Sequence, residues 1–270
     1  MPGLGILRTY NECMPWPAPL RRAITLRRQG LQLDLREFMS VRRAYNIVRQ
    51  RVGSDERLTF EEYAILCRLE FSREPMKTSD IAEYQGALRP TMTHRTNHLA
   101  SLGLIERTEG ASDRRNVVCS ITPAGSERLK ELSALTRAQI PTGRSLSRTS
   151  PDRISKYVDA MGSLFCKAGD LVLLGLYAAD GEPLTIMQVV DALGLLQPTV
   201  SMSVSALVER GQAVRDRGAA GAHTTSVTLT PEGRRAAEAI VARIEGLVVR
   251  RKLRGPRKAA PTAEADAPVE

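Results

Sequence analysis

The stretch that decides the fold spans residues 74–125 and reads EPMKTSDIAEYQGALRPTMTHRTNHLASLGLIERTEGASDRRNVVCSITPAG. Residues 182–233 repeat its pattern at a constant offset of 108 positions, without a gap: EPLTIMQVVDALGLLQPTVSMSVSALVERGQAVRDRGAAGAHTTSVTLTPEG. Fourteen of the 52 aligned positions are identical, including the pairs Gly86/Gly194, Pro90/Pro198 and Gly125/Gly233. Because one register held over this length is not expected by chance, the chain is predicted to contain two copies of one structural unit.

Each copy is predicted to consist of helices, a short hairpin and a last helix. In the first copy, apolar residues recur every three or four positions from Phe38 to Val52, which predicts a helix that packs against another helix. Further elements are expected as helices at about 59–71, 79–85, 89–102 and from 123 onward, and as strands at 104–108 and 117–122. Two short helices joined by a glycine turn and followed by a hairpin form a winged helix-turn-helix, whose second helix can enter a DNA major groove. The predicted fold class is mainly α with small β-hairpins, as two tandem winged helix-turn-helix domains.

The repeat also predicts how the 270 residues are divided. The expected order is an N-terminal arm (1–33), a first winged-helix domain (34–140), a linker (141–151), a second, degenerate winged-helix domain (152–252) and a disordered tail (253–270). The linker is long enough for the two domains to dock on each other within one chain.

The charge of the chain favours a polyanionic partner. Lys and Arg number 39 against 30 Asp and Glu, which gives a net charge of +9 and a pI of about 9.8. The net charge is +6 over residues 1–57, +2 over 58–150, −2 over 151–249 and +3 over 250–270. The basic character therefore lies in the first half and in the C-terminal segment.

Composition and cysteine usage indicate a soluble protein of a reducing compartment. The longest apolar run, residues 171–179, covers about half of the ~20 residues that span a bilayer. The first residues show no basic region followed by a long apolar stretch, so no secretory signal is expected and a cytoplasmic location is predicted. The four cysteines form no CxxC pair, and Cys67 and Cys119 are expected to be small buried residues.

The helix that begins at Arg89 carries the first set of candidate DNA contacts. If Met92, Thr96 and Leu99 face the core, the ~100° step per residue places the side chains of Thr91, His94, Arg95 and His98 on or near the opposite side. At the hairpin tip, Arg114 and Arg115 are expected to contact phosphates or a minor groove, with Asp113 positioning an arginine. The predicted DNA-binding residues are Arg89, Thr91, Thr93, His94, Arg95, Asn97, His98, Asp113, Arg114 and Arg115.

These residues lie in a segment that resembles the MarR family of winged-helix regulators. The resemblance rests on SDRRNVVCSITPAG (112–125), which is similar to the D-x-R wing and T-P-x-G motif of that family, and on the preceding helix TMTHRTNHLASLGLI. Thr93 stands where the family commonly has Ser or Thr, whereas His94 and His98 replace a common Arg and Asn97 replaces a frequent Asp. The resemblance implies a transcription regulator, usually a repressor, that dimerises through its terminal helices and is often released by a small ligand.

The second copy keeps the packing residues and loses most of the cations. At the offset of 108, Arg89, His94, Arg95 and His98 become Gln197, Met202, Ser203 and Ala206, and the tip residues Asp113, Arg114 and Arg115 become Gly221, Ala222 and His223. Since phosphate affinity scales with the number of cationic contacts, this copy is expected to bind DNA weakly. Its candidate contacts are Thr199, Ser201, Ser203 and His223.

These observations predict a sequence-specific double-stranded DNA-binding transcription regulator, expected to repress. It would act as a single-chain pseudo-dimer with a dominant first head, or two chains would associate to present two first heads. No nucleotide, metal or nucleophile motif is found, so no enzyme activity, cofactor or metal is expected, and His94 with His98 lacks a third ligand on the helix. Two alternatives stay open: a protein-interaction module, and a thiol-based redox sensor that uses Cys13.

Overall fold

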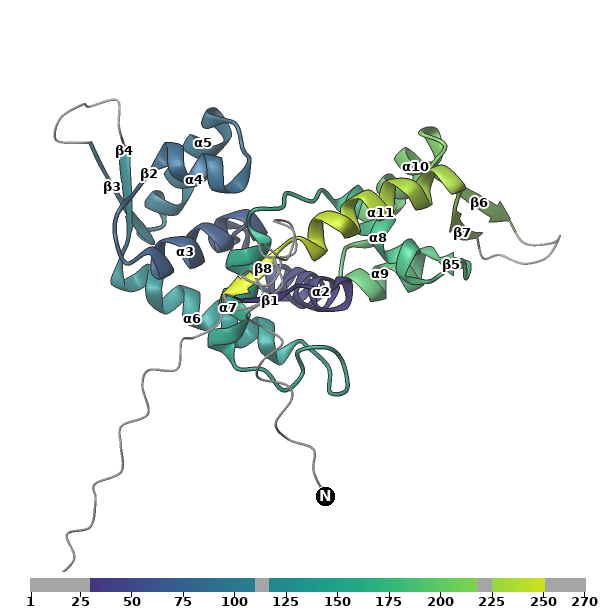
Figure 1. The fold of residues 1–270 in the computed structure, drawn as a ribbon, viewed down its shortest axis with the longest axis horizontal. Coiled ribbons are helices and arrows are strands. Elements are labelled where there is room, and N and C mark those ends of the chain that lie inside the picture. Colours follow the sequence, from purple (N-terminus) through teal and green to yellow (C-terminus); the bar gives the residue numbers. More distant parts are fainter. Residues whose placement is uncertain (1–29, 110–116, 218–224, 251–270) are drawn as a thin grey trace, which may run out of the picture.

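The computed structural model describes residues 30–109, 117–217 and 225–250 (Figure 1). The expected disordered tail and all but the last residues of the N-terminal arm lie outside these ranges. Within them the chain is mainly helical with small sheets, which confirms the predicted class at that level.

The elements of the first half follow the predicted order with shifts of a residue or two. Strand β1 (Gly30–Gln32) comes first, and then α2 (Leu35–Arg51), η1 (Ser54–Glu56), α3 (Phe60–Ser72), β2 (Met76–Lys77), α4 (Thr78–Gln85), α5 (Arg89–Ser101), β3 (Ile105–Glu109), β4 (Val117–Ile121) and α6 (Pro123–Ala138). Helices α2 and α3 each begin with a capping box, at Asp34 with Glu37 and at Thr59 with Glu62, which satisfies backbone N–H groups of their first turns.

The second half repeats this order of elements. It contains α7 (Pro151–Met161), α8 (Ala168–Ala178), β5 (Leu184–Thr185), α9 (Ile186–Leu193), α10 (Gln197–Glu209), β6 (Ala213–Arg217), β7 (Thr225–Leu229), α11 (Pro231–Glu245) and β8 (Val248–Arg250). A capping box of Thr185 with Gln188 is present at the start of α9. We call α3 to β4 (residues 60–121) the first head and α8 to β7 (residues 168–229) the second head.

Each head contains an antiparallel sheet of three strands, where the sequence predicted a two-stranded hairpin. The strand orders are β2-β4-β3 and β5-β7-β6. The pairs Ile105↔Ile121 and Ala213↔Leu229 occupy the same register at the offset of 108. The added strands β2 and β5 have two residues each, too few to show an alternating pattern in the sequence.

The T-P-x-G motif closes the hairpin onto the following helix. The Thr122 hydroxyl donates a hydrogen bond to the Gly103 carbonyl (2.7 Å) and accepts one from the Gly125 N–H (3.0 Å), so it caps α6. A Cβ atom on Gly125 would lie 2.0 Å from the Leu104 carbonyl oxygen, and one on Gly233 would lie 1.9 Å from the Gln212 carbonyl oxygen. Glycine is therefore required at both positions because backbone passes where a side chain would begin.

The first helix of each half packs on the other half. Helix α7 lies against α3 and α6, and α2 lies against α6, α7, α9 and α11. One continuous hydrophobic core results, in which Val41, Tyr63, Ile154 and Val158 are fully buried. Figure 1 shows the two heads at opposite ends of the molecule, with α5 and α10 on the same side of α2 and α7.

The two ends of the described chain are joined by a short sheet. Strand β1 pairs antiparallel with β8, with Gly30 opposite Arg250 and Leu31 opposite Val249, and the Leu33 N–H donates to the Leu247 carbonyl (3.1 Å). Leu33 and Val249 are buried by this pairing. The pairing of β1 with β8 was not predicted from the sequence. Strands of three residues are too short to show an alternating pattern, and these two lie far apart in the sequence.

Among the described residues, no single helix has both the length and the apolarity needed to cross a membrane. Helices α9 and α10 meet these limits only when taken together, and they are bent by 114° at the turn between them.

Candidate nucleic-acid interface

A tight turn sets the angle between α4 and α5. Gly86 ends α4 with a φ of 58°, and the Ala87 N–H donates to the Ala82 carbonyl (2.9 Å), which satisfies one of the last acceptors of the helix. Pro90 then lies in the first turn of α5, where its fixed φ suits a helix start. The buried stripe of α5 is Met92, Thr96 and Leu99, as the sequence predicted.

The solvent-facing side of α5 differs in part from the predicted one. Five predicted contact residues are exposed: Arg89, Thr91, Thr93, His94 and Asn97. They form a polar strip along α5 that begins with one arginine and continues with hydroxyl, imidazole and amide side chains. Hydroxyl, amide and imidazole groups of this kind can hydrogen-bond phosphates and base edges.

The predicted outward orientation of Arg95 and His98 is wrong. Arg95 is half-buried and donates to the Gln85 side-chain oxygen (2.7 Å), and its guanidinium lies 5.7 Å from the Phe165 ring centre. The His98 Nδ1 atom lies 2.7 Å from a Glu62 carboxylate oxygen, and the Glu62 side chain is 4% exposed. Each residue thus makes a polar contact with a helix beneath α5, Arg95 with Gln85 of α4 and His98 with Glu62 of α3.

A basic groove lies beside α5, where α4, α5 and the hairpin meet. Its lining combines three cationic side chains with three hydroxyl groups and one apolar residue: Lys77, Thr78, Ser79, Arg89, Thr93, Arg107 and Val117. The Nε atom of Arg107 is buried and has no hydrogen-bond partner there. No side chain caps the N-terminus of α4, so its first N–H groups and the helix dipole also favour an anion. The groove has the chemistry of a phosphate site.

The second head lacks this groove chemistry. Only one of the three cations is kept at the offset of 108, since the matching residues are Thr185, Ile186, Met187, Gln197, Ser201, Arg215 and Thr225. Arg215 donates to the Ser201 carbonyl (3.3 Å) and the Ser205 hydroxyl (2.8 Å), so its guanidinium is already engaged. The predicted contacts Thr199, Ser201 and Ser203 are half-buried. The two heads therefore differ in the number of cationic side chains at this position, three in the first head and one in the second.

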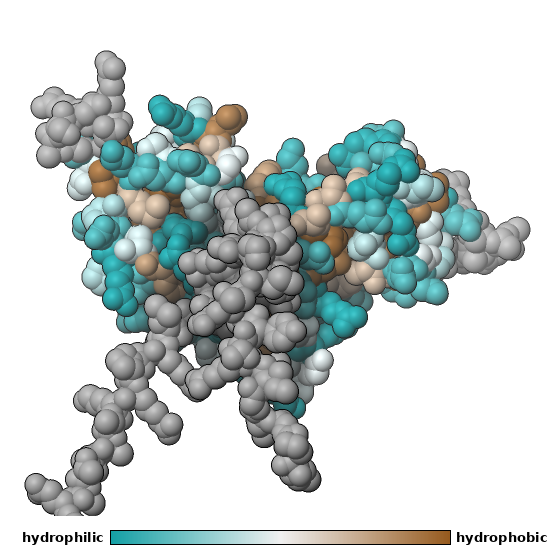
Figure 2. Space-filling model, viewed as in Figure 1, coloured by the Kyte–Doolittle hydropathy of each residue, from teal (hydrophilic) through white to brown (hydrophobic). Residues whose placement is uncertain are grey.

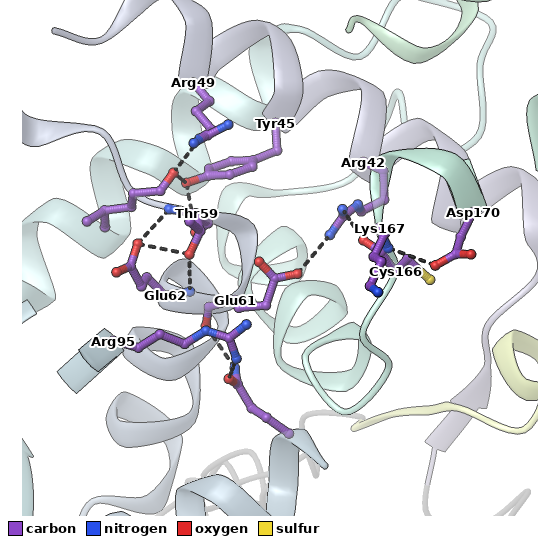
Figure 3. A network of polar contacts seen from close by, with 12 residues as sticks. Arg42, Tyr45, Arg49, Thr59, Glu61, Glu62, Arg95, Cys166, Lys167 and Asp170 are labelled. Atoms are coloured by element: carbon purple, nitrogen blue, oxygen red, sulfur yellow. Dashed lines mark hydrogen bonds and ion pairs between the residues drawn. The ribbon is translucent and has the colours of Figure 1, made fainter. Parts of the chain in front are cut away.

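Polar contacts connect the first head to the second half of the chain (Figure 3). Starting from Arg95, the Gln85 amide donates to the Glu61 carbonyl (2.8 Å), and the Glu61 carboxylate lies 3.8 Å from Arg42. Arg42, which is buried and lies over the Phe60 ring, donates to the Cys166 carbonyl (3.3 Å). Burial lowers the Arg42 pKa, and Glu61 opposes that effect. A continuous chain of contacts thus runs from α5 to the loop before α8.

A second connection runs through Asp159 on α7. Its carboxylate lies 2.9 Å from the Arg68 Nε atom, and its backbone carbonyl accepts a hydrogen bond from the Tyr84 hydroxyl of α4. The Arg68 guanidinium lies 3.9 Å from the Tyr84 ring centre. Burial raises the pKa of Asp159, and the Arg68 charge partly offsets this. The helix that positions α5 is therefore held by the other half of the chain.

Helix α2 holds the second head in a corresponding way. Three of its side chains donate to backbone carbonyls at the end of α9: Arg43 to Asp191 (2.8 Å), Asn46 to Leu193 (2.9 Å) and Gln50 to Gly194 (2.6 Å). These bonds satisfy acceptors that a helix C-terminus leaves open. Gly194 lies so close to α2 that a Cβ atom there would be 2.8 Å from the Arg43 carbonyl oxygen. The orientation of α9 and α10 is fixed by the first half.

The described cysteines do not suit a thiol sensor. Cys67 and Cys119 are fully buried, as predicted, and Cys166 is 4% exposed. Burial raises the pKa of Cys67 well above its usual value and raises that of Cys166 to about 11, despite the nearby Arg42. Since the thiolate is the reactive form, these two raised pKa values disfavour oxidation of Cys67 and Cys166. Cys13 lies outside the described residues. Within the described ranges, no three His, Cys, Asp or Glu residues are placed to hold a metal.

Four predicted contacts, Asp113, Arg114, Arg115 and His223, lie outside the described residues. Three residues that line the basic groove were not among the predicted contacts: Lys77, Ser79 and Arg107. One signal was present, because Arg107/Arg215 is an identical pair in the repeat and a charged residue in a strand is not needed for packing.

The first head contains a segment that matches a known protein family. Residues 58–117 match the model of the MarR family. Solved structures with similarity include BldR from Sulfolobus solfataricus, at 23% identity and a TM-score of 0.31, covering 44% of this chain and 77% of that one. AbsC, a MarR family transcriptional regulator from Streptomyces coelicolor, has 18% identity and a TM-score of 0.33 over 55% of this chain and 93% of its own. BpsR from Bordetella bronchiseptica has 19% identity and a TM-score of 0.32 over 50% and 90%. No curated protein matches the sequence. The family match supports a MarR-type winged helix within the first head.

Proposed function

We propose that this chain is a sequence-specific double-stranded DNA-binding transcription regulator that acts as a repressor. Its two halves are two winged helix-turn-helix domains of one chain, and they form an internal pseudo-dimer. The first head supplies most of the DNA affinity. The exposed strip of α5 contacts base edges, and the hairpin arginines Arg114 and Arg115 contact the DNA backbone.

The observation that carries this proposal is the basic groove beside α5. In protein–DNA complexes, phosphate contacts beside a DNA-reading helix fix the register of the protein on the duplex. The groove offers three cations, hydroxyl donors and a helix N-terminus at that flank, and one of its arginine nitrogens has no protein partner. The family match covers the same segment, from α3 to the first residue of β4. No catalytic constellation competes with this reading in the described residues.

The proposal also includes an asymmetric operator. Two identical heads read a palindrome, whereas a strong and a weak head on one chain favour a site whose halves differ. The packing of α7 on α3 and of α2 on α9 supports the internal pseudo-dimer. In each pair, a helix of one half packs on a helix of the other half.

The oligomeric state tests the internal pseudo-dimer directly. Light scattering on the purified chain at micromolar concentration is expected to give a mass near 29.6 kDa. A mass of about twice that value would instead show two associated chains, each able to present its first head.

Binding to duplex DNA and its salt dependence test the function. Replacing Arg114 and Arg115 with alanine is expected to weaken binding to every duplex and to lower the slope of log affinity against log salt by up to about two units. The matched positions Ala222 and His223 give the control, since the variant His223→Ala should change little. Equal losses from both heads would contradict the asymmetry. If no duplex binds in a salt-sensitive way, a protein-interaction module becomes the better account.

A small-molecule effector completes the proposal. DNA binding by BpsR is regulated by 6-hydroxynicotinic acid. In this chain, contacts through Arg42 and Asp159 connect the interface between the halves to the first head. A ligand that displaces α7 from α3 would therefore change the position of α4 and α5.

A further inference from the structure

Helix α10 of the second head exposes an apolar side chain at the position where α5 of the first head exposes a histidine. Figure 2 shows a largely hydrophilic surface with apolar patches on both heads. On α10, Met202 is 74% exposed, and it takes the position of His94 at the offset of 108. Ala206, one turn further on, is also exposed. No charged residue occurs between Gln197 and Val208, so this face of α10 is entirely uncharged.

Met202 is presented on a rigid support. The opposite stripe of α10, formed by Val200, Val204 and Leu207, is at most 1% exposed. The helix before it is fixed by the donors from α2, of which Asn46 and Gln50 are two. The exposed position of Met202 therefore follows from the packing of α10 and not from a loose segment.

From this placement we infer that Met202 is a specificity-determining residue, which reads the 5-methyl group of a thymine in the half-site bound by the second head. This inference rests on the proposed function. In the major groove, the thymine methyl is the apolar feature of a base edge, and apolar side chains recognise it by contact. A methionine suits this contact, since its thioether chain is flexible and polarisable.

The position of α10 favours DNA over a protein as the occupant of this face. Helices α5 and α10 lie on one side of the molecule in Figure 1, which is the arrangement expected if one duplex contacts both helices. The second head has few cations to hold phosphates, so its contribution is discrimination between bases with little added affinity. The recognised pair is A·T, since only that pair carries the methyl group.

The test removes the methyl group from the DNA. A duplex recovered from a random pool with the full chain is resynthesised with deoxyuridine in place of one thymidine at a time, and affinity is measured by fluorescence anisotropy. At one thymine outside the half-site of the first head, the substitution is expected to weaken wild-type binding about fourfold, the value for one buried methyl group. The loss should be the same at two salt concentrations, because no charge is involved.

Two variants distinguish a contact between Met202 and the thymine methyl group from a general loss of DNA affinity. Met202→Ala is expected to bind the thymine duplex about fourfold more weakly and to make the deoxyuridine substitution silent. Met187→Ala is the matched control: Met187 is 52% exposed on α9, at the position of the groove residue Ser79, and its variant should keep the deoxyuridine effect.

Each other outcome overturns the inference in a distinguishable way. If the duplex binds but every deoxyuridine substitution affects wild type and Met202→Ala equally, Met202 reads no methyl group while the proposed function stands. If, in addition, Met202→Ala abolishes capture of a protein partner, the face is a protein contact. If no duplex is recovered at all, the proposed function fails and this inference fails with it.

Discussion

Exchanging Lys77 for threonine and Arg89 for glutamine, the residues at the matching positions of the second head, is expected to lower the affinity for any duplex by about 30-fold at moderate salt. The physical reason is the loss of two cations from the groove beside α5. Each phosphate contact releases counterions, so the slope of log affinity against log salt falls by about two units. Fluorescence anisotropy at several salt concentrations measures both quantities. Both side chains are exposed, so the fold is retained.

The reciprocal exchange in the second head is the control. Gln197→Arg restores one cation of the groove there and is expected to raise affinity and steepen the salt dependence, and Thr185 is left unchanged because it caps α9. Circular dichroism and thermal melting check that all these variants fold alike. If the first exchange leaves the salt slope unchanged, the groove does not hold a phosphate, and the assignment of the first head as the dominant one loses its basis.

Replacing Gly125 with alanine produces the largest expected loss of stability. The new Cβ would lie 2.0 Å from the Leu104 carbonyl oxygen, and backbone on both sides is held by the hydrogen bonds of Thr122. The hairpin and α6 have to separate, which costs about 3 kcal/mol of unfolding free energy. For a chain of this size the melting temperature falls by about 6–12 °C. Differential scanning calorimetry measures the shift.

Two further glycine variants make this prediction specific. Gly233→Ala should cause a similar loss, because the same motif closes the second hairpin and a Cβ would lie 1.9 Å from the Gln212 carbonyl oxygen. Gly53→Ala should change the melting temperature little, since no atom lies within 4 Å of a Cβ placed there. A melting temperature unaffected by Gly125→Ala would mean that the motif is not a steric requirement.

The helices and strands of the two heads could be predicted well from the sequence because each pattern occurs twice, once in each copy of the repeat. Gly86 and Gly194 end helices at equivalent points, and Pro123 and Pro231 begin the last helices at equivalent points. The packing stripes of α5 and α10 were also predicted, since apolar residues recur at helical spacing. Patterns of this kind depend only on neighbours along the chain, which a sequence displays directly.

The orientation of individual polar side chains could not be predicted in the same way. Arg95 and His98 were expected on the outward face of α5, and they contact Gln85 and Glu62 instead. Helical spacing tells which positions oppose the apolar stripe, but half-buried flanking positions depend on partners that other helices supply. The groove residues Lys77 and Arg107 were not predicted as contacts, because they belong to separate elements that only the folded chain brings together.

The sheet formed by β1 and β8 has a consequence for how the protein is made. Residues 30–32 have their strand partner at residues 248–250. A ribosome adds about 5–20 residues per second, so this early segment waits many seconds for its partner to emerge. The pairing that covers Leu33 can therefore form only after the second half of the described chain has been synthesised.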